Sequence, residues 1–250
     1  MPVFQLTEEL LFPPPRLARK DGLLAVGGDL APERLLLAYS QGIFPWYSTG
    51  DPILWWAPSP RMILAPEEFH LTRRLAREIR KGTFAVTMDQ GFREVITACA
   101  AIREEKGPGT WITPEMLEAY CRLHALGFAH SVECWRDGEL AGGLYGVSLG
   151  TVFFGESMFS RVANSSKTAL AALCRQLAAW GFEMIDCQMK TAHLESLGAR
   201  EMPGEEFYRR LARCVRGPTR RGRWQLEVEG FGDVRPVMAP RSLRRTPGSS

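Results

Sequence analysis

The residues most suggestive of chemistry stand at the end of a short apolar strand. Residues 183–188 are predicted to form this strand, and side chains along a strand alternate between its two faces. Asp186 and Gln188 are therefore expected to point the same way, roughly 7 Å apart, with Lys190 following them. A carboxylate and an amide form an uncommon polar patch here. The alternative is that they make a capping interaction with the next helix.

A second predicted strand, over residues 151–159, carries an acidic side chain among apolar ones. On strict alternation Phe154, Glu156 and Met158 share one face. Burying a carboxylate is costly without a partner, and Gly155 beside it lets a ligand or another backbone come close. Glu156 could therefore meet a cationic substrate group, or it could form a structural salt bridge with Lys167 or a core arginine.

Two blocks of large aromatic rings stand apart from the periodic pattern of the core. Tyr39 and residues 43–47 place rings around a proline turn, and Trp111 lies at a predicted loop–helix junction. Rings on loops can stack on nucleic-acid bases. On the residues alone, packing between the two halves of the chain is the simpler explanation.

The composition is that of an ordinary globular protein. The chain has 250 residues, of which 45% are hydrophobic and 24% charged. Its net charge of +3 is too small to indicate nucleic-acid binding, but from Arg200 onward there are 12 Arg against 6 acidic residues. That basic end could contact phosphate, or it could be a solvated tail. A run of 18 apolar residues and a signal-peptide core are both missing, so we expect a cytoplasmic protein that does not enter a membrane.

Several kinds of catalysis lack the residues that they require. The six cysteines and four histidines show no metal-ligand spacing and no nucleophile setting, so no metal is expected and the thiols are expected to be reduced. Phosphate-binding and dinucleotide-binding glycine motifs are also missing.

The remaining pattern predicts the elements that position these residues. Helices are expected over residues 33–41, 66–81, 92–103, 114–126, 165–180 and 191–197, and strands over 84–87, 130–135, 139–149, 151–159 and 183–188. In the helix over 66–81, Arg73, Arg77 and Lys81 are spaced four apart and form a basic stripe. Strands, a hairpin and helices in this order predict an α+β fold with a mixed sheet from about residue 110.

Six blocks, in this order, resemble the leucyl/phenylalanyl-tRNA–protein transferase family. They are residues 22–30 (GLLAVGGDL), 41–46 (QGIFPW), 55–58 (WWAP), 109–113 (GTWIT), 154–161 (FGESMFSR) and 185–188 (IDCQ). The resemblance covers roughly residues 3–211. It implies a small N-terminal α/β domain over residues 1–85, with a boundary between 60 and 115. A catalytic domain with the N-acetyltransferase (GNAT) fold would follow over 86–215. The Arg-rich extension over 216–250 lies outside the resemblance, and its end is expected to be disordered because its last residues are small or helix-breaking.

The resemblance also implies a reaction. The family moves Leu, Phe and, less well, Met from aminoacyl-tRNA to the N-terminal Arg or Lys of acceptor proteins, which marks them for N-degron-dependent degradation. The ester of the donor is already activated, so such an enzyme mainly positions both substrates and helps the amine to lose a proton. An α-amino group has a pKa of about 7.7–8.0, so a useful fraction is neutral at physiological pH.

Roles for individual residues come with the resemblance. Gln188 would hold the attacking amine, Asp186 would polarise it, and Glu156 would attract the cationic acceptor. A glutamine is not a base, so the proton would leave through Asp186, water or the ribose hydroxyls. The donor side chain would occupy an apolar pocket formed by Leu144, Phe153, Met158, Leu170, Leu173, Leu177 and Ile185.

The resemblance further implies a set of tRNA contacts. Tyr39, Trp46 and Trp111 are the candidates to stack on the terminal adenosine. A basic helix of the N-terminal domain would contact the tRNA backbone through Arg73, Arg77, Arg80 and Lys81. We expect a monomer that binds Leu-tRNA or Phe-tRNA.

Two other functions are compatible with parts of the pattern. A CoA-dependent N-acetyltransferase would need a glycine-rich loop for the pyrophosphate, and residues 160–167 contain no glycine. We therefore expect no cofactor. A non-catalytic RNA-binding module would use the aromatic and basic residues but would leave Glu156, Asp186 and Gln188 without a role.

Overall fold

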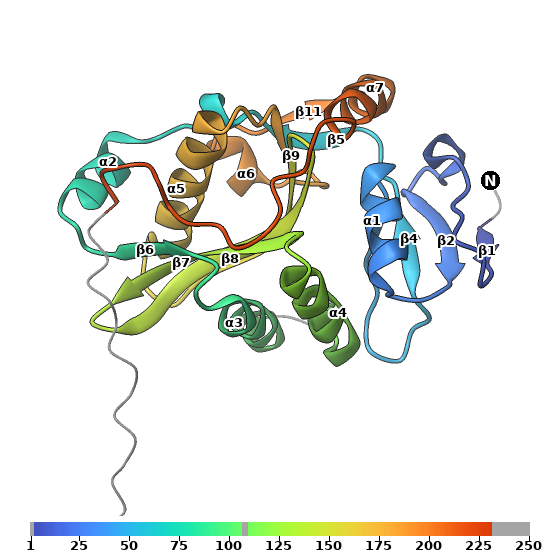
Figure 1. Ribbon diagram of the computed structural model, residues 1–250, viewed down its shortest axis with the longest axis horizontal. Coiled ribbons are helices and arrows are strands. Elements are labelled where there is room, and N and C mark those ends of the chain that lie inside the picture. Colours follow the sequence, from blue (N-terminus) through green and yellow to red (C-terminus); the bar gives the residue numbers. More distant parts are fainter. Residues whose placement is uncertain (1–2, 107–109, 232–250) are drawn as a thin grey trace, which may run out of the picture.

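The computed structural model describes residues 3–106 and 110–231, which build two sheets (Figure 1). The smaller sheet has four strands in the order β1-β2-β4-β3, and the larger has seven in the order β11-β5-β10-β9-β8-β7-β6. The chain is therefore an α+β protein with mixed sheets, as expected from the sequence. Gly109 and the last residues, 232–250, lie outside the described residues.

The smaller sheet and one helix form the N-terminal unit. Its strands are β1 (Phe4–Leu6), β2 (Leu23–Gly27), β3 (Phe44–Pro45) and β4 (Leu54–Trp56). Helix α1 (Pro32–Ser40) starts with Pro32 in its first turn, after the Asp29 side chain has accepted a hydrogen bond from the Ala31 amide at 2.8 Å. In Figure 1 this helix stands between its own sheet and the rest of the molecule.

The larger sheet forms the second unit. Its strands are β5 (Arg61–Leu64), β6 (Ala85–Met88), β7 (Ala129–Arg136), β8 (Glu139–Leu149), β9 (Val152–Ser160), β10 (Met184–Asp186) and β11 (Arg200–Met202). Neighbouring strands pair antiparallel except β9 and β10, which run parallel because α5 carries the chain back between them.

Helices cover both faces of this sheet. Their bounds are α2 (Arg73–Arg80), α3 (Phe92–Lys106), α4 (Pro114–Ala125), α5 (Ser165–Ala179), α6 (Ala192–Ser196) and α7 (Gly204–Cys214). Helix α5 packs on one face against β7 and β8, whereas α3 and α4 lie on the other face (Figure 1). The buried apolar residues form two clusters: one lies on the α5 face, and the other joins the α3 and α4 face to the core of the N-terminal unit.

The boundary between the two units lies earlier than residue 85. Strand β5 belongs to the larger sheet, so the N-terminal unit ends with β4. Helix α2 packs against α5, at the far end of the molecule from the smaller sheet (Figure 1). The expectation that the basic helix belongs to the N-terminal domain is therefore wrong, because its apolar face is buried against the larger unit.

One expected helix is divided into two pieces. Residues 66–68 form a short 3-10 helix, and α2 starts only after Thr72, whose side chain accepts a hydrogen bond from the Leu75 amide at 3.2 Å. Between them the His70 amide donates to the Leu197 carbonyl, so this stretch is held extended by a partner far along the chain.

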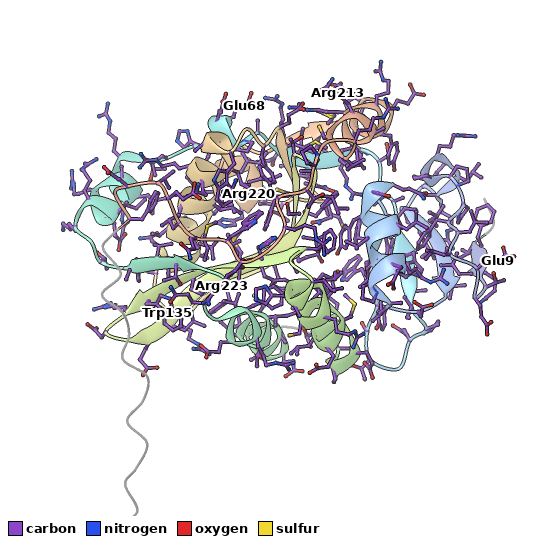
Figure 2. All side chains as sticks on the ribbon, viewed as in Figure 1. Glu9, Glu68, Trp135, Arg213, Arg220 and Arg223 are labelled. Atoms are coloured by element: carbon purple, nitrogen blue, oxygen red, sulfur yellow. The ribbon has the colours of Figure 1, made fainter. Side chains whose placement is uncertain are left out.

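Residues 217–231, here called the C-terminal strap, run back across the molecule from α7 toward α2 (Figure 1). Figure 2 places Arg220 and Arg223 along this path, while Arg213 lies on α7. The strap carries Trp224 and Phe231 into the apolar cluster on the α5 face. This part of the extension is therefore packed on the fold and is not a solvated tail.

Candidate active site

A β-bulge sets the direction of Glu156. Opposite β9, Tyr145 pairs with Ser157 and Gly146 pairs with Gly155, so Glu156 is the extra residue of β9. The inserted residue shifts the alternation, and the expectation that Phe154 and Met158 share a face is wrong. Phe153 and Met158 lie on the α5 face, whereas Phe154 lies on the other.

The position opposite the bulge, Gly146, has no room for a side chain. A Cβ atom on Gly146 would lie 2.2 Å from the Phe154 carbonyl oxygen and 2.6 Å from the Phe153 ring. Any larger residue would push the two strands apart at the point where they are most distorted. Gly146 thus lets β8 and β9 pair closely around Glu156.

Two tyrosines from other elements bind the Glu156 carboxylate. Tyr39 of α1 donates to it at 2.7 Å, and Tyr120 of α4 donates at 3.2 Å, while the two hydroxyls also contact each other. Burial raises the Glu156 pKa to about 7, against the opposing effect of the two hydrogen bonds. Burial, and then the charge of Glu156, raises the pKa of both tyrosines well above the usual value. They therefore stay protonated as donors.

Asp186 does not form an open polar patch with Gln188, the arrangement expected from the sequence, because its carboxylate is held in a buried ion pair. Its Oδ1 accepts from Arg61 Nε at 2.8 Å and its Oδ2 accepts from Arg61 Nη2 at 2.7 Å. The side chains are 1% (Arg61) and 0% (Asp186) exposed. The guanidinium also lies between the Phe44 and Phe207 rings, 4.9 and 4.8 Å from their centroids.

Gln188 lies beyond the end of β10 and not on it. The strand stops at Asp186, and Gln188 has a φ of 57°, in the left-handed region. Its backbone amide donates to Asp186 Oδ1 at 2.9 Å. The side chain lines a pocket, and its Nε2 has no hydrogen-bond partner among the described residues. Asp186 and Gln188 are thus joined through the backbone, and of the two only Gln188 lines the pocket.

The pocket beside Gln188 has a volume of about 450 Å³ and combines an apolar floor with polar groups. Six residues of the predicted donor pocket line it, namely Leu144, Phe153, Met158, Leu170, Leu173 and Ile185. Glu156 and Gln188 line the same pocket. Leu177, the seventh predicted residue, does not line it, because its side chain is 0% exposed inside the cluster beneath α5.

Only two of the three rings predicted to stack on the adenosine lie at the pocket. Trp46 and Trp111 both line the pocket, and Trp46 also packs on Trp56 with ring centroids 5.5 Å apart. Tyr39 is only 1% exposed and uses its hydroxyl on Glu156. The expectation that it stacks on a base is therefore wrong, because neither face of its ring is available.

The predicted basic stripe is exposed. Arg73, Arg77, Arg80 and Lys81 are all solvent-accessible on α2 or at its end. Within the described ranges none of the four forms an ion pair. Helix α2 is tied to the start of α5 by a hydrogen bond in which the Asn164 side-chain Nδ2 donates to the Glu78 carboxylate at 2.6 Å.

Sequence reasoning missed several residues of the site. Tyr120 lies on the buried face of α4, and its spacing in the sequence does not distinguish it from a tyrosine that only packs in the core. Arg61 gave a weak signal, since it is a charged residue that opens the apolar strand β5. Lys190 and His193 also line the pocket, beside α6. Neither has a sequence signal of its own, since Lys190 only follows Gln188 and His193 has no metal-ligand or nucleophile spacing.

Residues 3–106 and 110–231 contain no cluster of three or more His, Cys, Asp or Glu side chains that could hold a metal ion. Over the same residues, every helix is too short or too polar to cross a lipid bilayer.

An apolar pocket that ends in a carboxylate and an amide suits an enzyme that transfers an acyl group to an amine. The sequence profile of the leucyl/phenylalanyl-tRNA protein transferase matches residues 63–212, and that of its N-terminal domain matches residues 28–59. The chain belongs to this family, and it is an aminoacyltransferase.

Curated relatives agree with the profiles. A leucyl/phenylalanyl-tRNA–protein transferase of Desulfatibacillum aliphaticivorans is 62% identical over 92% of this chain and 98% of its own length. One from Nitrosospira multiformis is 59% identical over 90% of this chain and 97% of its own. Among solved structures, the C-terminal domain of a putative lysylphosphatidylglycerol synthetase from Agrobacterium fabrum covers 80% of this chain and 66% of its own at 12% identity. Its TM-score is 0.38, which is too low to support an argument about the fold.

Proposed function

We propose that this enzyme moves Leu or Phe, and less well Met, from aminoacyl-tRNA to the N-terminal Arg or Lys of acceptor proteins. The observation that carries the proposal is the pocket itself. Its apolar floor suits the donor side chain, and Glu156 and Gln188 suit a cationic amine at the same place. In a cell this product would mark the acceptor for N-degron-dependent degradation. We further propose that the enzyme works as a cytoplasmic monomer.

The chemistry follows from which groups are available. The acceptor nitrogen attacks the ester carbon, an amide forms, and the bond to the ribose oxygen breaks. Gln188 holds the amine through its side-chain amide. Arg61 binds both oxygens of Asp186, and the Asp186 side chain is 0% exposed, so Asp186 does not contact the amine. Asp186 instead fixes the Gln188 backbone.

Glu156 is the better base. With a pKa of about 7 it can take the first proton from the ammonium group near neutral pH. The second proton of the amine leaves with the ribose oxygen. The fixed hydroxyls of Tyr39 and Tyr120 stabilise the carboxylate form of Glu156 between turnovers.

The tRNA would approach from the pocket toward α2. Trp46 and Trp111 stack on the terminal adenosine, and Arg73, Arg77, Arg80 and Lys81 contact the phosphate backbone. These contacts do not depend on base sequence, so several tRNAs with a suitable amino acid would be accepted.

We also propose that the larger unit is a GNAT-like catalytic domain that does not use acetyl-CoA. In support, the parallel pair β9 and β10 is joined by α5 in an otherwise antiparallel sheet. Before α5, where a CoA pyrophosphate would need a glycine-rich loop, the Ser160 hydroxyl donates to Ser166 at 2.8 Å and the segment has no glycine.

The test is a transfer assay with labelled Phe-tRNA and two peptides that differ only in beginning with Arg or Gly. We expect label on the Arg peptide alone, and ribonuclease treatment of the tRNA should abolish the transfer. Labelled acetyl-CoA serves as the competing donor. No label from Phe-tRNA, or efficient label from acetyl-CoA, would contradict the proposal.

A further inference from the structure

The C-terminal strap is held to the sheet and to α5 by hydrogen bonds to buried groups. The Trp224 amide donates to the Asp89 carboxylate at 2.7 Å, and the Glu227 amide donates to the Gln176 side chain at 2.6 Å. Both acceptors are buried. The strap is therefore attached to the fold at Trp224 itself and again three residues later, at Glu227.

The Trp224 side chain fills a site that is aromatic on several sides. It is 2% exposed. Its ring stacks on His130 with centroids 3.7 Å apart, and Trp180 meets it edge-on at 4.9 Å. The indole nitrogen donates to the Arg220 carbonyl at 3.0 Å. Both the ring plane and its rotation are thus fixed.

The Phe153 ring lies next to Trp224 and also lines the pocket. The two ring centroids are 6.0 Å apart, with the planes tilted by 38°. Phe153 lines the pocket together with Leu144 and Leu170, and Gly146 confines its ring from the neighbouring strand. Because interiors are close-packed, a side chain held between fixed neighbours has little freedom to retreat from a ligand.

We propose that Trp224 sets the depth of the donor pocket by holding the Phe153 ring in place, and that it thereby governs the choice between donor side chains. The inference rests on the proposed function, since it assigns the apolar pocket to the donor amino acid. Trp224 acts through Phe153 and is a positioning residue.

A smaller residue at 224 would leave room into which the Phe153 ring can move. The pocket would deepen, and a bulky donor would gain more than a small one. When two substrates differ by one methylene group, an apolar pocket discriminates between them by roughly 10–200-fold. Because Phe153 forms only one wall of the donor pocket, we expect the change in donor selectivity to lie near the lower end of this range.

The experiment compares Trp224→Leu and Trp224→Phe with the wild-type protein. For each, kcat/KM is measured with Leu-tRNA, Phe-tRNA and Trp-charged tRNA, alongside the melting temperature. The matched control is Phe231→Leu, which removes a buried ring from the same strap at a place where it packs under Arg175.

We expect the Leu variant to raise the ratio of Phe to Leu transfer by roughly tenfold and the Phe variant by about threefold. The control should keep the wild-type ratio. A ratio within twofold of wild type in the folded Trp224 variants, or an equal shift in the control, would overturn the inference. If the Leu variant does not fold, the Phe variant decides alone. A wild-type protein that transfers no amino acid would instead contradict the proposed function.

Discussion

Removal of Arg61 is expected to destabilise the protein strongly and to abolish transfer, because the Asp186 carboxylate would be left buried without a partner. Asp186 is 0% exposed and receives two short hydrogen bonds from one guanidinium, at 2.7 and 2.8 Å. Breaking such a pair by removing one member costs about 3–5 kcal/mol. For a chain of this length that corresponds to a fall in Tm of roughly 10 °C.

A double-mutant cycle separates the stability of the ion pair from its role in the site. Arg61→Met and Asp186→Leu should each lower the free energy of unfolding by about 3–5 kcal/mol, whereas the combined variant should recover most of that loss because no charge is left unpaired. Urea unfolding gives all four values. Transfer should stay low in the double variant, since the Gln188 amide has then lost its acceptor.

Two results would refute this reasoning. One is a decrease of less than about 1 kcal/mol in the free energy of unfolding of both single variants, because that is the range expected for an exposed ion pair. The other is a double variant that regains both stability and transfer. In that case Asp186 would not be needed to hold the Gln188 turn.

Four more predictions concern Glu156, Trp111 and the basic helix α2. Transfer should increase with pH through about 7, since Glu156 accepts a proton only when ionised; Glu156→Gln should be slow and should lose this dependence, and an unchanged pH profile would exclude Glu156 as the base. Burial also raises the Glu156 pKa above its value in the unfolded chain, so Glu156 favours folding at low pH and this contribution is lost as pH rises toward 7. In urea unfolding, the stability of Glu156→Gln should not show this decrease with pH. Trp111→Ala should raise KM for Phe-tRNA by roughly tenfold with little change for the peptide, because stacking of a base contributes about 1–3 kcal/mol. Charge reversal at Arg77 and Lys81 should weaken tRNA binding most at low salt, and a loss that does not depend on salt would exclude phosphate contact.

Local sequence patterns predicted most of the elements. The hairpin of β8 and β9, the helix α5 and the helix α1 with its proline start lie within a residue or two of the expected bounds. Such elements depend on periodicity and on turn residues, which are local. Strand β5 and helix α7 were not predicted. All four residues of β5 are buried, so it shows no alternation, whereas α7 does carry a helical pattern, with Phe207, Leu211 and Cys214 buried at spacings of four and three.

The site was harder to predict because it depends on pairing between distant segments. The bulge that redirects Glu156 exists only against the register of β8, and strict alternation therefore gave the wrong face for Met158. Arg61 precedes Asp186 by 125 residues, so no local pattern could show that the carboxylate is occupied. The burial of Tyr39 likewise depends on its contact with Tyr120.

The most direct test of the account is single-turnover transfer of labelled Phe from its tRNA to an Arg-initiated peptide. Wild-type protein, Glu156→Gln and Gln188→Ala are compared, with tRNA binding measured for each. We expect transfer by the wild type, and transfer slower by roughly tenfold or more in both variants with nearly unchanged tRNA affinity. Wild-type rates in both variants, or a loss of tRNA affinity as large as the loss of rate, would contradict the assignment of this pocket as the place of transfer.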